Sequence, residues 1–237
     1  MVRFDHRPAD SVPELPDLDP GVTLLALPDR ELVPLHSLVL DHLLCTGGTA
    51  LWIDARNHGP SQVLARLAPS SRVLERVRIA RGFTAFQHAA IVENAASHID
   101  PDTTLVVAPA IDGPYRDEDV RGVEPRALLV RSLARLARYA REDDLTVLLT
   151  RTAADHLGVP VATTAQSVLE VEQTRLGPRF VGPDFETLVY RDVGPGHDQT
   201  TLAFWKRILV ARQPRYDTAA PSAGSPSALE VTARGPD

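Results

Sequence analysis

The sequence predicts an α/β fold with a mainly parallel central sheet, helices on both faces and an antiparallel β extension. Short apolar runs alternate with segments of helical periodicity through the first two thirds of the chain, which is the pattern of strand–helix–strand units. The runs 104–108 and 145–150 are continuously apolar in their central positions, as expected of strands buried on both faces. After residue 165 the chain changes to shorter β-rich pieces, which predict the extension at one edge.

The alternating part predicts five strands and four helices. The strands are expected at 22–27, 49–54, 77–80, 104–108 and 145–150. The helices are expected at 35–44, 61–67, 86–98 and 125–141. In the last helix Leu129, Leu133 and Leu136 form one apolar stripe, and Pro125 suits the first turn. Strands joined through such helices make right-handed crossovers, so the sheet is expected to be mainly parallel.

The later β pieces and the two chain ends complete the expected organisation. The β pieces are expected at 167–172, 179–181, 187–191 and 200–205, and they are expected to extend one edge of the sheet as antiparallel strands. Residues 1–20 contain four prolines, which interrupt regular structure and predict a flexible lead. Residues 213–237 are rich in Pro, Ser, Ala and Gly and predict a disordered tail. The folded domain is therefore expected to span 21–212.

Composition narrows the classes of function. The chain has 237 residues, of which 43% are hydrophobic, enough for one α/β domain with a sizeable core. No apolar run reaches the ~18–20 residues of a membrane-spanning helix, and no apolar signal segment is visible, so we expect a cytoplasmic protein without a membrane partner. Cys45 is the only cysteine, which excludes an internal disulfide and a cysteine zinc cluster. The net charge of −6 argues against an unaided nucleic-acid binder.

Two segments and their order resemble the RecA/RadA recombinase family. Residues 50–54 read ALWID and residues 76–83 read RVRIARGF, similar to the "WIDTE" and "φφARAF" segments of archaeal RadA-like proteins. Residues 115–118, YRDE, resemble the "FRxE" stretch of the same family. The resemblance covers about residues 20–205 and implies a RecA-like P-loop-type sandwich. It also implies that 104–108 is the Walker B strand.

The phosphate-binding loop that this resemblance requires is absent. A P-loop has the pattern GxxxxGK[ST], in which glycine backbone amides and a lysine hold the phosphates and a hydroxyl binds Mg²⁺. Residues 27–37 contain no glycine and no lysine, and they contain the carboxylates of Asp29 and Glu31. His36 and Ser37 fall near the usual Lys-Thr pair, but a neutral imidazole is a poor substitute for lysine. No phosphate cradle is expected here.

The two catalytic carboxylates of the family are missing as well. Ala108 and Pro109 stand where the Walker B aspartate belongs, and Asp112 comes too late to replace it without a rearranged loop. Arg56 stands at the position of the water-activating glutamate, and an arginine cannot act as a general base at neutral pH. We therefore predict a pseudo-ATPase rather than an enzyme, with no catalytic residues, no cofactor and no metal ligands.

Three further features allow a functional and a structural interpretation. Asp54 is either a remnant catalytic carboxylate or, as we favour, a structural residue that caps the next segment. Arg131, Arg135 and Arg138 have i, i+4, i+7 spacing on one helix face; they could contact a partner or phosphates, but an ordinary solvated face is favoured. The pattern at 86–89, FQHA, resembles the FxxA anchor between recombinase protomers, but it falls inside an expected helix, so buried packing is favoured.

The leading functional hypothesis is a non-catalytic RecA/RadA-like accessory protein in DNA recombination or repair. Its partner would be an active RecA-family recombinase or a second copy of the chain. Single-stranded DNA would be contacted by Arg131, Arg135 and Arg138 or by loops after Thr150. The first alternative is a KaiC-like regulatory interaction protein with no DNA role. The second is a nucleotide-binding ATPase with an unorthodox site.

Overall fold

The first strand of the chain lies inside the sheet, between strands that come more than a hundred residues later. The computed structural model describes residues 12–28, 32–55, 61–117, 125–175, 177–189 and 201–219. Within these ranges it contains an eight-stranded sheet of order β3-β2-β4-β5-β1-β6-β7-β8. All neighbours from β3 to β6 are parallel, whereas β6, β7 and β8 pair antiparallel. The expected mainly parallel sheet with an antiparallel extension is therefore confirmed.

The strands follow the hydrophobic pattern of the sequence. Their bounds are β1 Gly21–Ala26, β2 Thr49–Ala55, β3 Val77–Gly82, β4 Thr103–Ala108, β5 Thr146–Leu149, β6 Ser167–Thr174, β7 Gly177–Val181 and β8 Glu186–Leu188. The central strands β4 and β5 are buried along nearly their whole length, because helices cover both faces. In β6, Leu169 and Val171 are buried while Glu170 and Glu172 are exposed, the alternation of a strand with one wet face.

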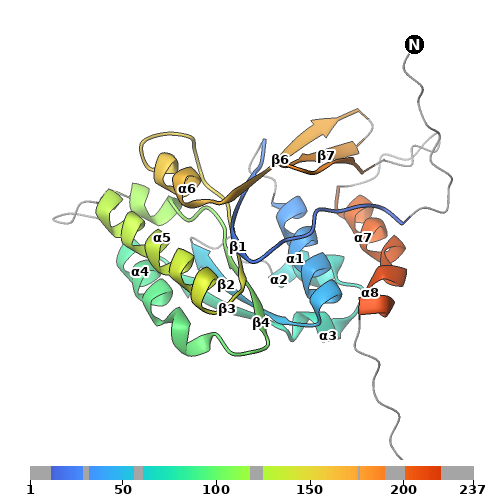
Figure 1. Cartoon of the computed structure of the whole chain (residues 1–237), viewed down its shortest axis with the longest axis horizontal. Coiled ribbons are helices and arrows are strands. Elements are labelled where there is room, and N and C mark those ends of the chain that lie inside the picture. The colour runs from blue at the N-terminus through green and yellow to red at the C-terminus, as the bar shows by residue number, and fades with distance from the viewer. Residues whose placement is uncertain are drawn as a thin grey trace, which may run out of the picture.

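Helices cover both faces of the sheet (Figure 1). One face carries α1 Val33–Thr46, α2 Ser61–Leu67, α3 Ser71–Leu74 and α7 Thr201–Ala211, with α8 Gln213–Ala219 packed against α1. The other face carries α4 Ala85–Asn94, α5 Pro125–Glu142 and α6 Gly158–Thr164. Two short 3₁₀ helices, η1 Ala95–His98 and η2 Gly113–Arg116, lie in the connections. The two layers of apolar side chains between sheet and helices form the core.

The connections change face in the middle of the sheet, and this creates a crevice. The helices after β1 and β2 lie on the first face, and the helices after β3, β4 and β5 lie on the second. Because β1 lies beside β5 and β2 beside β4, neighbouring strands send their chains to opposite faces at their carboxyl ends. Such a switch point is where open α/β sheets bind ligands. The carboxyl edge of β1, β5, β4 and β2 is therefore the first place to look for a site.

One expected strand is a helix. Residues 200–205 were expected to be β, but α7 runs through Thr201–Ala211. Trp205, Ile208 and Leu209 are buried at helical spacing and pack in the apolar layer that contains α1. The spacing of the apolar residues therefore indicates a helix when the residues after 205 are included in the pattern. The sequence interpretation also missed α3, α6 and α8. Of the segment expected at 187–191, β8 contains only the first residues, and 190–191 lie outside the described residues.

Both described chain ends are more ordered than expected. Leu15 and Leu18 of the supposed flexible lead are 2% and 9% exposed, and the hydroxyl of Thr146 donates to the carbonyls of Leu18 and Asp19. Residues 213–219 of the supposed tail form α8, with Tyr216 buried. Residues 1–11 and 220–237 lie outside the described residues. In the described part, no helix has both the length and the apolar character needed to cross a membrane.

Candidate functional site

The amino end of α1 lies where the resemblance would put a triphosphate, and its chemistry is apolar. The helix begins after Leu32 without a side-chain cap, and Pro34, which has no N–H to offer, lies in its first turn. Pro34, Leu35 and His36 are buried. The hydroxyl of Ser37 is used inside the helix, where it donates to the carbonyl of Val33 at 2.9 Å. Anion binding at a helix start needs free backbone amides facing solvent, and this helix start does not offer them.

His36 is packed against the sheet. Its ring stacks on Trp52 of β2, with the ring centroids 5.2 Å apart and the planes inclined by 23°. Its Nδ1 donates to the carbonyl of Leu32 at 2.5 Å. Burial lowers the pKa of His36 to about 4, because the protonated ring would have to carry its charge away from water. A neutral, stacked imidazole therefore fills the position of the family's cationic lysine.

Asp54 ends β2 on the same face of the sheet as Trp52. Its side chain is completely buried, and its Oδ2 accepts a hydrogen bond from Nε of Arg81 at 2.8 Å. Arg81 is the cross-strand partner of Asp54 in the β2–β3 register. The structural interpretation of Asp54 is therefore favoured, but its partner is the neighbouring strand rather than the next loop. Its Oδ1, like Nε2 of His36, has no hydrogen-bond partner among the described residues.

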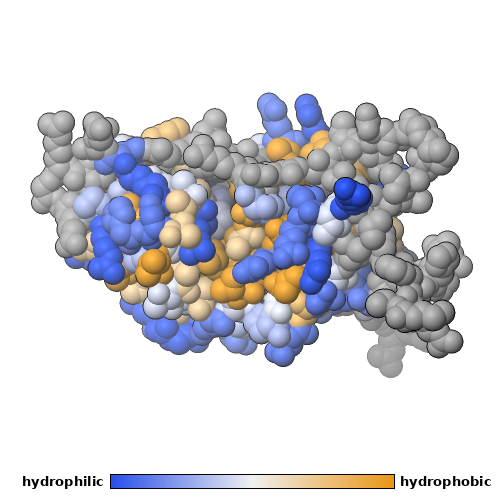
Figure 2. Space-filling view, turned by 90° about the horizontal axis from the view of Figure 1, so that it is seen from above, coloured by the Kyte–Doolittle hydropathy of each residue, from blue (hydrophilic) through white to orange (hydrophobic). Residues whose placement is uncertain are grey.

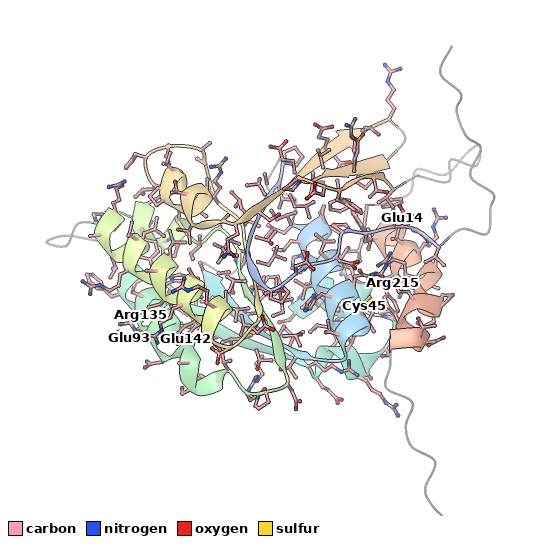
Figure 3. All side chains as sticks on the ribbon, viewed as in Figure 1. Glu14, Cys45, Glu93, Arg135, Glu142 and Arg215 are labelled. Carbon is pink, nitrogen blue, oxygen red and sulfur yellow. The ribbon has the colours of Figure 1, made fainter. Side chains whose placement is uncertain are left out.

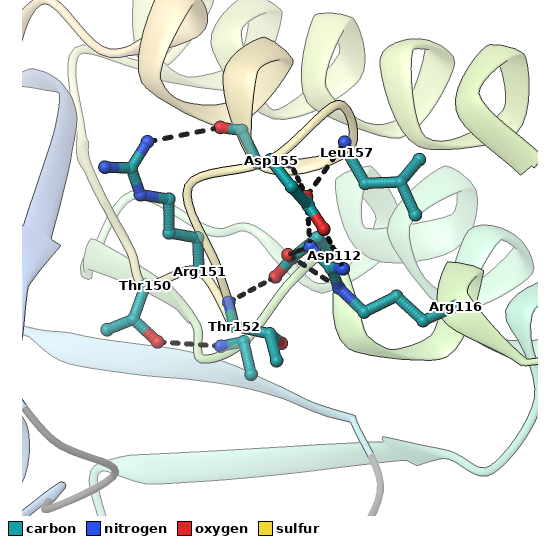
Figure 4. A network of polar contacts seen from close by, with 9 residues as sticks. Asp112, Arg116, Thr150, Arg151, Thr152, Asp155 and Leu157 are labelled. Atoms are coloured by element: carbon teal, nitrogen blue, oxygen red, sulfur yellow. Dashed lines mark hydrogen bonds and ion pairs between the residues drawn. The ribbon is translucent and has the colours of Figure 1, made fainter.

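The carboxyl ends of β4 and β5 are joined by one network of polar contacts (Figure 4). Asp112, completely buried, accepts hydrogen bonds from Nε of Arg116 at 3.0 Å and from the backbone N–H of Thr152 at 2.7 Å. Arg116 also donates to both carboxylate oxygens of Asp155, at 2.6 and 2.7 Å. The hydroxyl of Thr150 accepts from the backbone N–H of Ala110 at 2.7 Å. These contacts close the loop after β4 onto the loop after β5.

This network leaves little free charge for a ligand. The hydrogen bonds from Arg116 hold the pKa of Asp155 well below its ordinary value, so this carboxylate stays ionised. Asp155 also accepts from the backbone amides of Leu157 and Gly158, which places it at the start of α6. A hollow of about 440 Å³ lies beside the network, between Tyr115 and His156. Two arginines line it: Arg116, which two carboxylates already neutralise, and the exposed Arg126.

The predicted arginine stripe lies on one face of α5, but two of its members are paired. Arg135 contacts Glu93 of α4 at 2.5 Å, and Arg138 contacts Glu142 one turn later at 3.3 Å. Figure 3 shows Arg135, Glu93 and Glu142 together on this side of the molecule. Arg131 is exposed and has no ion-pair partner among the described residues. Two of the three stripe arginines are therefore compensated by nearby carboxylates.

The expected burial of the FxxA-like pattern is wrong. Phe86 is 48% exposed and the nearby Phe83 is 62% exposed, although Ala85 and His88 between and beyond them are buried. The helix is set by a Thr84 cap, whose hydroxyl accepts from the N–H of Gln87 at 3.2 Å. The buried face of α4 is formed by Ala85, His88 and Val92, and Phe86 lies outside it.

Exposed apolar side chains also occur at one sheet edge and on the upper surface. Ile79 of β3 is 39% exposed, and β3 is an outer strand of the described sheet. On the face turned toward the viewer in Figure 2, apolar residues gather in a central strip between hydrophilic flanks. Exposed apolar residues of this kind, together with a strand edge, are typical of protein-contact surfaces.

Two buried polar clusters were not anticipated from the sequence. On the second face, Nδ1 of His88 lies 2.9 Å from the hydroxyl of Tyr115, which lies 2.8 Å from the hydroxyl of Ser132. On the first face, Arg212 and Tyr216 both donate to the carboxylate of Asp41. A buried charge or hydroxyl is normally hydrogen-bonded. In these clusters the bonded residues are distant in the sequence, so no local sequence pattern predicts the pairing.

The lone cysteine and the acidic side chains do not form a reactive centre. Burial raises the pKa of the Cys45 thiol, which opposes the thiolate form needed for nucleophilic chemistry. Figure 3 shows Cys45 beside Glu14 and Arg215, where α1 meets the carboxyl-terminal helices. Within the described ranges no three His, Cys, Asp or Glu side chains are grouped closely enough to hold a metal ion.

Fold and site define an α/β domain in which the loops after β4 and β5 are bonded to each other at the carboxyl edge of the sheet. No model of a known protein family matches the chain, and no curated protein matches it either.

Proposed function

We propose that this protein is a non-catalytic relative of the RecA/RadA core that acts by protein–protein contact, as an accessory to an active recombinase in DNA recombination or repair. The observation that carries the proposal is the packed start of α1. Pro34 and Leu35 are buried there and His36 stacks on Trp52, so a triphosphate would meet apolar atoms and a neutral ring instead of amides and a lysine.

The order of elements supports kinship with the RecA-like core. The strands predicted at 49–54, 104–108 and 145–150 fit the order of elements in the resemblance, and β2, β4 and β5 lie at these positions. The buried Asp112–Arg116 pair adds a second argument against catalysis, because Asp112 is already satisfied by Arg116 and Thr152. Fold kinship alone does not give a function, so the contact role needs its own surface.

The best surface for such contact is the β3 edge with the start of α4. β3 is an edge strand, and Ile79, Phe83 and Phe86 near it are exposed. An edge strand offers backbone N–H and C=O groups to a partner, and exposed aromatic side chains supply the anchors that dominate binding energy.

Co-purification with the recombinase of the same organism tests the proposal. The tagged protein should retain the recombinase at native salt, and Phe86→Asp should abolish the association. Val130→Asp is the matched control, because Val130 is similarly exposed (43%) on α5 but lies outside the β3–α4 surface. Absence of association, or equal loss in both variants, would count against the proposal.

Nucleotide binding is the sharpest opposing result. Titration with a fluorescent ATP analogue should show no binding tighter than ~100 μM, which corresponds to about 5.5 kcal/mol. Tighter binding that is lost in His36→Ala would instead support the ATPase with an unorthodox site, for which the unpartnered Nε2 of His36 and Oδ1 of Asp54 are the supporting observation.

One observation favours the regulatory alternative without a DNA role. Arg135 and Arg138 are paired with Glu93 and Glu142, which reduces the positive field that phosphates require. Single-stranded DNA binding, measured at several salt concentrations, separates the two hypotheses. Salt-sensitive binding that weakens in Arg131→Ala favours the recombination accessory, and no binding at low salt favours the KaiC-like regulator.

A further inference from the structure

A hollow of about 330 Å³ lies at the amino ends of β1 and β6, on the sheet edge opposite the Asp112–Arg116 network. One wall is the extended segment 16–20, and the other is the turn at 182–185 between β7 and β8. Binding pockets for small molecules measure roughly 300–1,000 Å³. This hollow is at the lower end of that range, so it has room for one side chain or a small amine but not for a nucleotide.

The back of the hollow is built by a close approach at Gly21. The backbone there has φ of +126°, and a Cβ would come within 2.4 Å of Oε1 of Gln166. This lets the Gln166 side chain lie across Gly21 and accept a hydrogen bond from the N–H of Val22 at 2.7 Å. Only glycine combines this backbone conformation with the absence of a side chain.

The floor is apolar with one unpaired hydroxyl. Leu18 and Leu169 are 9% and 4% exposed, and Phe185 is half-buried. Thr23 lines the hollow and is only 8% exposed as a residue, and its hydroxyl is bonded to no other described residue but is not one of the fully buried unpartnered atoms. A hydroxyl that water reaches can accept a hydrogen bond from a ligand.

The rim is acidic. Asp17, Asp19 and Asp184 line the hollow, and no Lys, Arg or His is among its lining residues. Asp17 is paired with Arg215 at 2.5 Å, so Asp19 and Asp184 supply the uncompensated charge. These carboxylates are not grouped closely enough to ligate a metal ion, as no such group exists among the residues described. A diffuse acidic rim over an apolar floor suits an organic cation.

We propose that this hollow binds an arginine side chain presented by a partner protein. The guanidinium group would lie between Asp19 and Asp184, its alkyl stem against Leu18 and Leu169, and the Thr23 hydroxyl would accept one of its N–H groups. Arginine suits the site better than lysine, because its planar, weakly hydrated group donates to several acceptors at once and stacks on rings such as that of Phe185. The proposal rests on the proposed function in that both assign the protein a contact role.

The test is a titration of ¹⁵N-labelled protein with acetyl-arginine-N-methylamide, followed by NMR chemical shifts. Saturable shifts are expected at the amides of Gly21, Thr23 and Gly182, with a dissociation constant on the order of 1 mM. The neutral isostere acetyl-citrulline-N-methylamide should give no saturable shift. Equal shifts with citrulline would overturn the proposal.

Variants assign the effect to the rim. Asp19→Asn combined with Asp184→Asn should raise the dissociation constant at least tenfold, and Thr23→Val should raise it severalfold. Asp143→Asn is the matched control, since Asp143 is also an exposed carboxylate but lies at the end of α5, and it should change nothing. Unchanged affinity in the double variant would overturn the proposal. So would binding of agmatine more than tenfold tighter than the blocked arginine, because it would point to a free amine as the ligand.

Failure of this proposal is distinguishable from failure of the proposed function. Tight ATP binding would overturn the contact role while leaving the arginine titration as expected. Absence of arginine binding would overturn this site alone, because the recombinase test uses the β3–α4 surface.

Discussion

Arg212 and Asp41 form a bidentate ion pair that joins the two ends of the described chain. Nε and Nη2 of Arg212 lie 2.6 and 2.8 Å from the two carboxylate oxygens of Asp41, and the side chains are 1% and 4% exposed. The hydroxyl of Tyr216 donates to the same carboxylate at 2.7 Å, and Arg212 also donates to the carbonyl of Pro13 at 2.5 Å. One buried group thus holds the segment 12–20, α1 and α8 together.

Removal of one member of this pair should be strongly destabilising. Arg212→Ala leaves the Asp41 carboxylate buried without its main partner, so the free energy of unfolding should fall by about 3–5 kcal/mol. Arg215→Ala is the matched control, because its pair with Asp17 is 41% and 64% exposed and should contribute about 0–1 kcal/mol. Urea denaturation measures both. Equal effects of the two variants would show that Asp41 finds another partner.

Two buried histidines should make stability depend on pH between about 4 and 6.5. Burial lowers the pKa of His36 and His88 from 6.5 to about 4, so in this range the unfolded chain binds protons that the folded protein does not. Stability should therefore be complete above pH 6.5 and fall as the pH is lowered, on the order of 3 kcal/mol per histidine at pH 4. Urea midpoints at pH 7, 6, 5 and 4.5 measure the slope.

Substitution controls identify the titrating group. His88→Gln can still bond Tyr115 but cannot be protonated, so it should remove the contribution of one histidine, leave that of His36, and reduce the slope by about half. His156→Gln should leave it unchanged, because His156 is exposed. A slope that stays the same in His88→Gln would assign the effect to other groups.

The network between β4 and β5 should depend on its buried carboxylate more than on its exposed one. Asp112→Ala leaves the N–H of Thr152 without its acceptor and removes the buried one of the two carboxylates that bind Arg116, so it should cost about 1–3 kcal/mol. Asp155→Ala should cost less, because the Asp155 side chain is 41% exposed and water can replace it. Thermal unfolding of the two variants measures the order, and the reverse order would contradict the arrangement described.

Two glycines with positive φ should respond differently to a methyl group. Gly21→Ala should cost about 2–4 kcal/mol, because it strains the backbone and pushes Gln166 away from Val22. Gly47→Ala should cost about 1–2 kcal/mol, because Gly47 at the end of α1 also has positive φ (+74°) but nothing lies within 4 Å of the added Cβ. Denaturant midpoints test the difference, and equal costs would mean that Gln166 relaxes freely.

The order of the regular elements could be predicted because the hydrophobic pattern of each element is contained in a short stretch of sequence. The apolar runs at β4 and β5 and the stripe on α5 (Leu129, Leu133, Leu136) are visible within a few residues, and all three became buried as expected. The absence of a phosphate-binding pattern before α1 is equally local. These features can be predicted without knowing which residues pack against them.

The rest depends on partners that are distant in the sequence. The helix α7 was mistaken for a strand because the burial of Trp205 and Leu209 depends on their packing against the face of the sheet that carries α1. Leu15 and Leu18 looked like part of a flexible lead because nothing near them shows that the core has room for them. Phe86 was expected to be buried, but the face of α4 that packs on the core is that of Ala85, His88 and Val92, and which face packs depends on distant elements.

The place of β1 in the sheet has a consequence for synthesis on the ribosome. Gly21 to Ala26 pair with β5 on one side and with β6 on the other, up to Glu170, so the earliest strand to emerge waits for its neighbours. At about 5–20 residues per second, this delay is on the order of ten seconds, during which an apolar strand has no native partner. The nascent chain should therefore be a client of ribosome-associated chaperones until its sixth strand has emerged.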